Sequence, residues 1–289
     1  MAGISTFTNV NAREIDFVTR FGNSIKALQD IMGISNPVKK APGTKLVAYT
    51  ASVSLETSPA TKGGAIPYSV ANITEAAKAD VEIKKYAKAV AIEDVAQYGA
   101  EVAVEKTDDA FLNELQGEVI DEFYTFAQTG SLTDTATNFQ DGVADAIGLV
   151  KDKFSKMRKT VTSVVVFVNT RDAYKYLGAA SLGVQNQFGV DYIENFMGAR
   201  VILTSEIASG TVIAIPSDNI VLYYVDPADS DFAKLGLEYT TDGATNLIGF
   251  HVEGNYGTAV GESFALMGMR LWAEYLDGIA VVTIPPVTP

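Results

Sequence analysis

His251 is the only histidine of the chain, and so the first candidate for acid–base chemistry or metal binding. The sequence contains no cysteine, which excludes disulfides, thiolate nucleophiles and cysteine-ligated metals. His251 stands between Phe250 and Val252 in a strand-like run that offers no partner at the spacing of a zinc site or a catalytic triad. We therefore interpret His251 as a structural residue and expect no zinc chemistry.

Asp226, Asp229 and Asp231 form an acidic cluster that a hard cation such as calcium could use. The central glycine and the terminal glutamate of a calcium loop are missing, so a turn or helix cap is the favoured interpretation. The stretch at Thr61 lacks the spacing of a phosphate-binding loop. We expect no cofactor and no catalytic residue; a carboxylate-dependent hydrolase stays a remote alternative, because sequence does not show which carboxylates converge.

The charge balance argues against a protein that grips nucleic acid. The chain has 22 basic and 35 acidic side chains and a formal charge of −13, which opposes binding through phosphate neutralisation but allows a wall that encloses DNA. Apolar runs reach only about six residues, as at 220–225, against the roughly 20 that a membrane span needs. We expect neither a membrane span nor export.

The first third of the chain predicts a helix followed by an extended arm. Apolar residues recur every three or four positions over residues 12–32, which predicts one helical stripe; its members are Ile15, Val18, Phe21, Ile25, Leu28 and Met32. The stripe packs either on its own core or on a neighbouring subunit. Residues 37–68 predict two strands around a polar, glycine-rich turn, and such an arm needs a partner surface.

The remaining two thirds alternate helices and strands. A strand is predicted near 79–92, then a helix of roughly 30 Å over 108–128, capped by Thr107 or Asp108. A polar joint at 131–138 leads to a second helix at 139–157, which opens a new lobe of mixed helix and strand. Further strands are expected at 164–168, 200–204, 211–215, 220–225, 249–272 and 278–284, and a short helix after Asn169.

Taken in order, these elements resemble the Hong Kong 97-type fold of tailed-bacteriophage major capsid proteins. Three stretches are also similar to that family: residues 88–95 before the long helix, 126–130 at its end, and 166–173 in the second lobe. The resemblance covers nearly the whole chain and rests on element order more than on any strict signature. It implies an α+β fold with an amino-terminal arm, an extended loop, a spine helix, a peripheral domain and an axial domain.

The resemblance also implies boundaries. The arm and helix would occupy 1–36 and the extended loop 37–73. The peripheral domain would combine 74–130 with 245–284 around the spine helix, the axial domain would be the insertion at 131–244, and 285–289 would form a tail.

The function that the resemblance implies is a major capsid protein that assembles as hexamers and pentamers into an icosahedral shell around double-stranded DNA. DNA would be enclosed without sequence-specific binding, and partners would be a separate scaffolding protein, a portal and decoration proteins. The protein would be located in the virion after assembly in the bacterial host cytoplasm. An encapsulin-like nanocompartment shell shares the fold and is the alternative.

Residues that would contact other subunits follow from the same picture. We expect them on the amino-terminal helix, the extended loop and the exposed face of the spine helix; they are Phe17, Phe21, Leu55, Lys62, Tyr68, Glu114 and Glu118. Some members of the family crosslink a loop lysine to a neighbour's asparagine, for which Lys62 and Asn255 are conceivable partners, although a lysine at a loop tip is usually only solvated.

Overall fold

The computed structural model describes residues 6–58, 62–178, 183–187, 190–229, 232 and 234–285. The helices are α1 (Thr6–Met32), α2 (Ile92–Tyr98), α3 (Lys106–Ala127), α4 (Phe139–Lys156) and α5 (Thr170–Leu177), with a π-helical turn η1 (Glu101–Glu105) directly before α3 and 3₁₀ turns η2 (Ser217–Asn219) and η3 (Leu276–Gly278). In the described residues no helix is both long and apolar enough to cross a membrane.

The strands form four sheets. A seven-stranded mixed sheet has the order β5 (Leu132–Thr135), β15 (Ala280–Thr283), β10 (Thr211–Pro216), β6 (Val164–Asn169), β9 (Ala199–Thr204), β8 (Val190–Phe196) and β7 (Gln185–Gln187). Two three-stranded sheets have the orders β12 (Ile248–Asn255), β13 (Val260–Met267), β4 (Lys84–Ala91) and β1 (Val38–Lys39), β11 (Ile220–Tyr224), β14 (Met269–Ala273). The fourth is a hairpin of β2 (Thr44–Ser54) and β3 (Val70–Val81).

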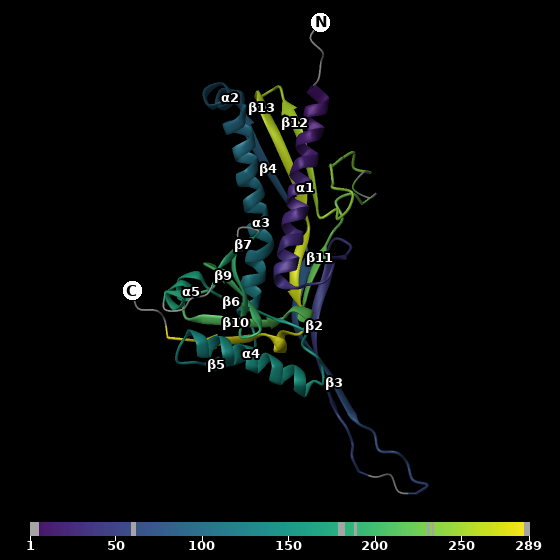
Figure 1. Cartoon of the computed structure of the whole chain (residues 1–289). Helices are drawn as coiled ribbons and strands as arrows, with labels where there is room; N and C mark the ends of the chain where they lie inside the picture. The colour runs from purple at the N-terminus through teal and green to yellow at the C-terminus, as the bar shows by residue number, and fades with distance from the viewer. Residues whose placement is uncertain are drawn as a thin grey trace.

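The molecule is elongated, with a projecting hairpin (Figure 1). Helices α1 and α3 lie alongside the sheet of β4, β12 and β13 and form one arm of the body. The seven-stranded sheet, with α4 packed on β10 and β15, forms a second lobe beside the lower part of α3. The hairpin of β2 and β3 leaves the body on the side away from α5.

Helix α1 packs on the chain's own core. Phe17 and Phe21 are 2% and 0% exposed, and the Phe17 ring stacks on Phe250 with centroids 4.0 Å apart. Ile15, expected in the buried stripe, is instead 54% exposed, because the inward face is centred on Phe17, Phe21, Ile25 and the residues at their helical spacing. The own-core alternative for the stripe is therefore the one that the structure shows.

The spine helix starts differently from the prediction. It continues from η1, and no side chain caps its first turn. Asp108, expected as the cap if Thr107 is not, lies inside the helix and is 5% exposed. The preceding helix α2 and turn η1 occupy residues for which the sequence predicted no helix, since this short segment buries only Ala103 and so lacks an apolar stripe.

Helices of the second lobe follow local sequence signals. Helix α4 begins at Phe139, as predicted, where the Asn138 side chain accepts a hydrogen bond from the backbone N–H of Asp141 at 3.0 Å. The predicted short helix α5 is capped in the same way by Asn169. Buried Asp172 accepts hydrogen bonds from Ser209 Oγ and the backbone N–H of Gly210. The motif at 166–173 therefore joins strand, helix and turn.

Strand pairing does not follow the expected domain boundaries. Strand β15, expected in the peripheral part, pairs with β5 and β10 of the seven-stranded sheet. Strand β11, expected in the axial part, pairs with β14 and β1 instead. The last strand thus returns to the second lobe, and the division of the chain at 131–244 stays a proposal.

The burial of α1 gives the first prediction. Phe21→Ala removes a fully buried ring and should lower the free energy of unfolding by about 3–5 kcal/mol, the usual cost of a large-to-small change in a core. The matched control is Ile15→Ala on the exposed side of the same helix, which should change it by less than about 0.5 kcal/mol. Urea unfolding of both variants measures the difference, and equal losses would contradict this packing of α1.

Candidate functional site

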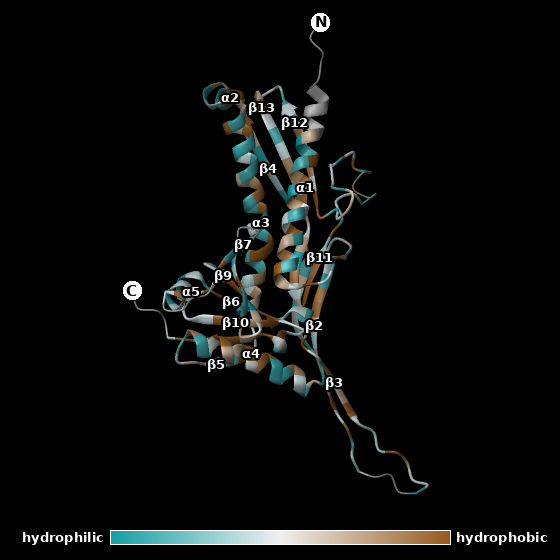
Figure 2. Ribbon diagram, viewed as in Figure 1, coloured by the Kyte–Doolittle hydropathy of each residue, from teal (hydrophilic) through white to brown (hydrophobic). Residues whose placement is uncertain are grey.

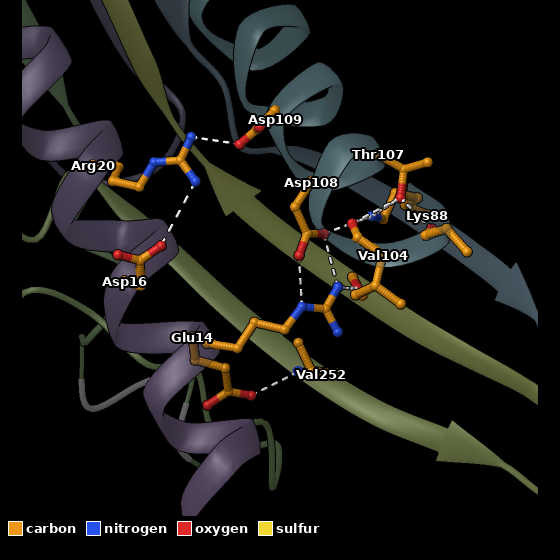
Figure 3. Close-up of polar contacts among 12 residues, drawn as sticks. Glu14, Asp16, Arg20, Lys88, Val104, Thr107, Asp108, Asp109 and Val252 are labelled. Atoms are coloured by element: carbon orange, nitrogen blue, oxygen red, sulfur yellow. Dashed lines mark hydrogen bonds and ion pairs between the residues drawn. The ribbon is translucent and has the colours of Figure 1, made fainter. Parts of the chain in front are cut away.

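A buried carboxylate, Asp108, connects three elements of the body (Figure 3). The Arg13 guanidinium of α1 donates to both of its oxygens, from Nε at 2.6 Å and from Nη2 at 2.7 Å. Lys88 Nζ of β4 donates to the same carboxylate at 2.5 Å and to Thr107 Oγ1 at 2.7 Å. Arg13 also donates to Ser263 Oγ of β13 at 3.1 Å. We call Arg13, Lys88 and Asp108 the ionic clamp.

The clamp shifts the protonation of its members. Burial alone would raise the pKa of Asp108, but hydrogen bonds from Arg13 and Lys88 outweigh it and hold that pKa below its ordinary value. Burial lowers the pKa of Lys88, which the bond to Asp108 only partly offsets. Because a buried charge without a partner is costly, the clamp stabilises the fold only while all three groups are in place.

A second buried acid, Glu14, connects α1 to strand β12 and to Thr240. It is 4% exposed, and its two carboxylate oxygens accept hydrogen bonds from the Val252 backbone N–H at 2.6 Å and from Thr240 Oγ1 at 2.5 Å. His251 Nδ1 lies 3.4 Å from the same carboxylate. The histidine thus faces a group already bound by the backbone, which agrees with the structural role expected for it.

The exposed surface of α1 adds one further link. Arg20 donates to Asp109 of α3 at 2.6 Å and lies 3.6 Å from Asp16 of its own helix (Figure 3). The pKa of Arg20 is raised, and the hydrogen bond to Asp109 is the largest cause. Burial acts in the opposite direction, and the charges of Asp109 and Asp16 add to the increase. The polar contacts between α1 and α3 therefore position helices; we find among them no group placed to attack a substrate.

The hairpin is anchored only at its foot. Leu46, Ala48 and Val81 are buried together with Trp272, whose ring stacks on Phe126 with centroids 4.3 Å apart. Beyond this foot large apolar side chains are exposed; they are Tyr49, Val53, Leu55, Ile66, Tyr68, Val70 and Ile73, each 52% to 93% exposed. Figure 2 shows hydrophobic stretches, in brown, along the projecting strands. Such a run of exposed apolar residues marks an interaction surface.

The residues expected to contact other subunits fall into two groups. Phe17 and Phe21 are in the core, so their side chains are not on the surface of this chain, and that part of the expectation is corrected. Leu55, Lys62 and Tyr68 are exposed on the hairpin. They stay candidates for contacts between subunits.

The two spine residues of the same expectation differ from each other. Glu114 is exposed and has no ion pair among the residues that the structure describes. Glu118 accepts a hydrogen bond from Lys84, which also binds Glu122. Burial lowers the pKa of Lys84, but the two glutamates outweigh it and the pKa is raised. Glu118 is thus partly neutralised within the chain, whereas Glu114 is available to a partner.

The acidic cluster considered for calcium binds a lysine. Lys39 Nζ lies 2.8 Å from an Asp226 carboxylate oxygen and 3.8 Å from one of Asp229, and Asp226 also accepts from the Ala228 backbone N–H. Asp231 lies outside the described residues. Across the described parts of the chain no group of three acidic or histidine ligands is arranged to hold a metal ion.

The sequence interpretation missed the clamp, although one signal for it exists. Asp108 precedes the buried residues Leu112, Leu115 and Val119 at helical spacing, so periodicity places its carboxylate on the inward face of α3. A charge on an inward face requires a paired cation. Arg13 lies 95 residues away in the sequence, so the local pattern around Asp108 does not predict which cation pairs with it.

Comparisons with solved structures assign the fold. The structure is similar to the capsid asymmetric unit of cyanophage A-1(L), with a TM-score of 0.55 and 10% identity over 88% of this chain and 91% of that chain. For a structure from Mycobacterium phage Patience the TM-score is 0.52, at 11% identity over 96% and 89% of the two chains. For the mature capsid of bacteriophage PhiM1 it is 0.51, at 9% identity over 89% and 87%. The chain has a phage capsid fold.

The α+β Hong Kong 97-type capsid fold expected from the order of elements is thereby confirmed. No protein-family model and no curated protein matches the sequence. In this capsid fold the clamp lies between the amino-terminal helix and the spine helix, and the hairpin corresponds to the extended loop that the sequence predicted.

The clamp gives the second prediction. Asp108→Asn leaves Arg13 and Lys88 without a carboxylate and should cost on the order of 3 kcal/mol of unfolding free energy. The control is the neighbouring Asp109→Asn: Asp109 is 53% exposed in its pair with Arg20, so this change should cost below about 1 kcal/mol. Chemical unfolding of both variants at pH 7 tests this, and equal losses would contradict the clamp.

The pH dependence of the same variants gives a further readout. Because the folded-state pKa of Asp108 is below its ordinary value of 3.8, the clamp's contribution is complete above that value and is lost as pH falls through the lower folded pKa. The wild-type chain should therefore lose stability more steeply below about pH 4 than Asp108→Asn does. If stability falls equally steeply with pH in the wild type and in Asp108→Asn, protonation of Asp108 does not contribute to acid unfolding, which would contradict this prediction.

Proposed function

We propose that this chain is the major capsid protein of a tailed phage, a structural subunit that assembles as hexamers and pentamers into an icosahedral shell around double-stranded DNA. The observation that carries the proposal is the combination of a capsid fold along nearly the whole chain with a hairpin whose apolar side chains have no core of their own. A two-stranded hairpin is only marginally stable alone in water, so this one needs a partner surface.

The surface of another copy is the partner that this fold favours. Identical subunits that bind through two different surfaces form head-to-tail contacts, which close into rings when the rotation between copies allows it. The hairpin supplies one surface, and Leu55, Lys62 and Tyr68 lie on it. A hydrolase finds no support in the polar contacts of the described residues, which serve packing.

The wider set of partners belongs to the same proposal. A separate scaffolding protein, a portal and decoration proteins would complete the head, in a virion assembled in the cytoplasm of a bacterial host. The net charge of −13 suits an inner wall that encloses DNA without binding its sequence. An encapsulin-like shell would form similar particles and would be recognised by a copurifying cargo protein.

Hairpin truncation tests the proposal. We expect the purified wild-type chain at high concentration, with and without a crowding agent, to form closed shells, rings or curved sheets in negative-stain images and fast-sedimenting species. Replacing 55–69 by Asn-Gly keeps the pairing of Ser54 with Val70 and closes the shortened hairpin with a favoured two-residue turn. This variant should unfold at the wild-type urea concentration and form no shells.

Two results would count against the proposal. A wild-type chain that stays a monomer or dimer under every condition would contradict a shell subunit. Shells of normal shape from the truncated variant would show that the hairpin is not the surface on which assembly depends.

A further inference from the structure

The carboxyl end of α4 carries a dense cluster of positive charge in an acidic chain. Nine residues, 151–159, contain five of the 22 basic side chains and one acidic one, and we call them the basic run. Lys153 pairs with Asp277 at 2.7 Å and Lys156 with the exposed Asp152. Lys151 and Arg158 are exposed and have no carboxylate within ion-pair distance among the described residues.

The basic run lies at the foot of the hairpin. Lys159 Nζ sits 3.6 Å from the centre of the Tyr275 ring, and Tyr275 lines a pocket together with Leu46 and Tyr49 of β2. In Figure 1, α4 ends beside the point where β2 and β3 leave the body, on the side of the molecule from which the hairpin projects. The basic run therefore lies close to the point where the hairpin leaves the body.

A groove on the other side of α3 carries the opposite charge. It is formed between α3 and strands β8 and β9, and its acidic lining residues are Asp121, Asp191 and Glu206. Glu114 lies about two turns before Asp121 on the same helix. We call these four residues the acidic groove. In Figure 1, β7, β9 and α5 lie across α3 from the hairpin.

The carboxylates of the groove are not neutralised within the chain. In the part of the chain that the structure describes, none of the four lies within ion-pair distance of a lysine or arginine; Asp191 accepts only from Asn186 and Tyr174, and Glu206 only from Ser205 among side chains. Burial and the charges of Glu206, Glu118 and Glu114 raise the pKa of Asp121. Like charges left close together favour the approach of a cation.

We propose that the acidic groove of one copy receives the basic run of a second copy, as the charge-paired contact between adjacent subunits of a ring. The inference rests on the proposed function and names the partner surfaces within it. The two surfaces differ and lie on opposite flanks of one chain, so each copy offers one to each neighbour, as a closed head-to-tail ring requires. Opposite potentials also fix the register of the two copies and disfavour head-to-head contacts.

Charge reversal with rescue tests the proposal. Lys151→Glu with Arg158→Glu reverses the two side chains of the basic run that have no carboxylate within ion-pair distance among the described residues, and Asp121→Lys with Glu206→Lys reverses two of the four carboxylates of the acidic groove. Each pair alone removes the net charge of its surface and should raise the protein concentration needed for assembly about tenfold or more. All four changes in one chain let the new glutamates pair with the new lysines across the contact, and should return that concentration towards the wild-type value.

A matched control separates the contact from total charge. Lys26→Glu with Lys106→Glu makes the same change in net charge as Lys151→Glu with Arg158→Glu, at exposed lysines outside both surfaces, and should assemble like wild type in the same salt. Urea unfolding of every variant confirms that each is folded. Sedimentation and negative-stain imaging over a series of concentrations give the readout.

Several outcomes overturn the inference. Assembly of either reversed pair at the wild-type concentration, or no rescue by the four changes together in folded protein, would show that these surfaces do not pair. Unchanged assembly with loss of DNA retained in shells would assign the basic run to nucleic acid instead. If the wild-type chain never associates, both the proposed function and this inference are wrong. If the wild-type chain forms normal shells and the charge variants assemble at the same concentration, only this inference is wrong.

Discussion

The buried carboxylate of Asp108 is the interaction on which the body of this subunit depends. It lies on the inward face of α3 and is bound at once by Arg13 from α1 and Lys88 from β4. An unpaired charge at that depth would be costly, so all three elements are held in one register. In that register Phe17 stacks on Phe250 and Phe21 lies in the same core, so the first helix of the chain is part of the arm that α1 and α3 form.

The arm of α1 and α3 buries an apolar face, whereas the projecting part of the hairpin exposes its apolar residues. Leu46 and Val81 at the foot of the hairpin are buried, whereas Leu55, Ile66 and Tyr68 beyond it are 70% to 93% exposed. A monomer gains nothing from this exposure, whereas the proposed assembly would bury these side chains against a second copy. The same contrast applies to charge, because Asp108 is paired inside the chain, whereas Lys151 and Arg158 and the carboxylates of the acidic groove have no ion pair among the described residues.

Local signals in the sequence predicted much of the fold. Helix α4 was predicted from its apolar stripe and from the polar joint at 131–138 before it, because periodicity and turn composition act within a few residues. The order of elements sufficed for the capsid fold. Strand partners were not predictable, since β15 joins β10 and β5 across 64 and 145 residues or more of chain, and such pairing depends on tertiary contacts.

The candidate sites, too, depend on tertiary contacts that local sequence patterns do not predict. Val53 and Val70 have the apolar character of core strands, yet they are 63% and 58% exposed because no second layer of this chain covers them. Phe17 and Phe21 look equally suited to a core or to a neighbour, and only the packed helix decides. The partner of Asp108 lies 95 residues away, beyond any spacing rule, although the inward position of Asp108 itself is readable.

Amide hydrogen exchange of the hairpin, compared between dispersed subunits and assembled particles, tests the central claim most directly. Backbone amides of 55–58 and 62–69 have no strand partner within the described chain, so they should exchange rapidly in dispersed subunits and become protected on assembly, while those of α1 and α3 stay protected throughout. Hairpin amides that are protected in the free subunit, or that exchange equally fast in both forms, would contradict the account.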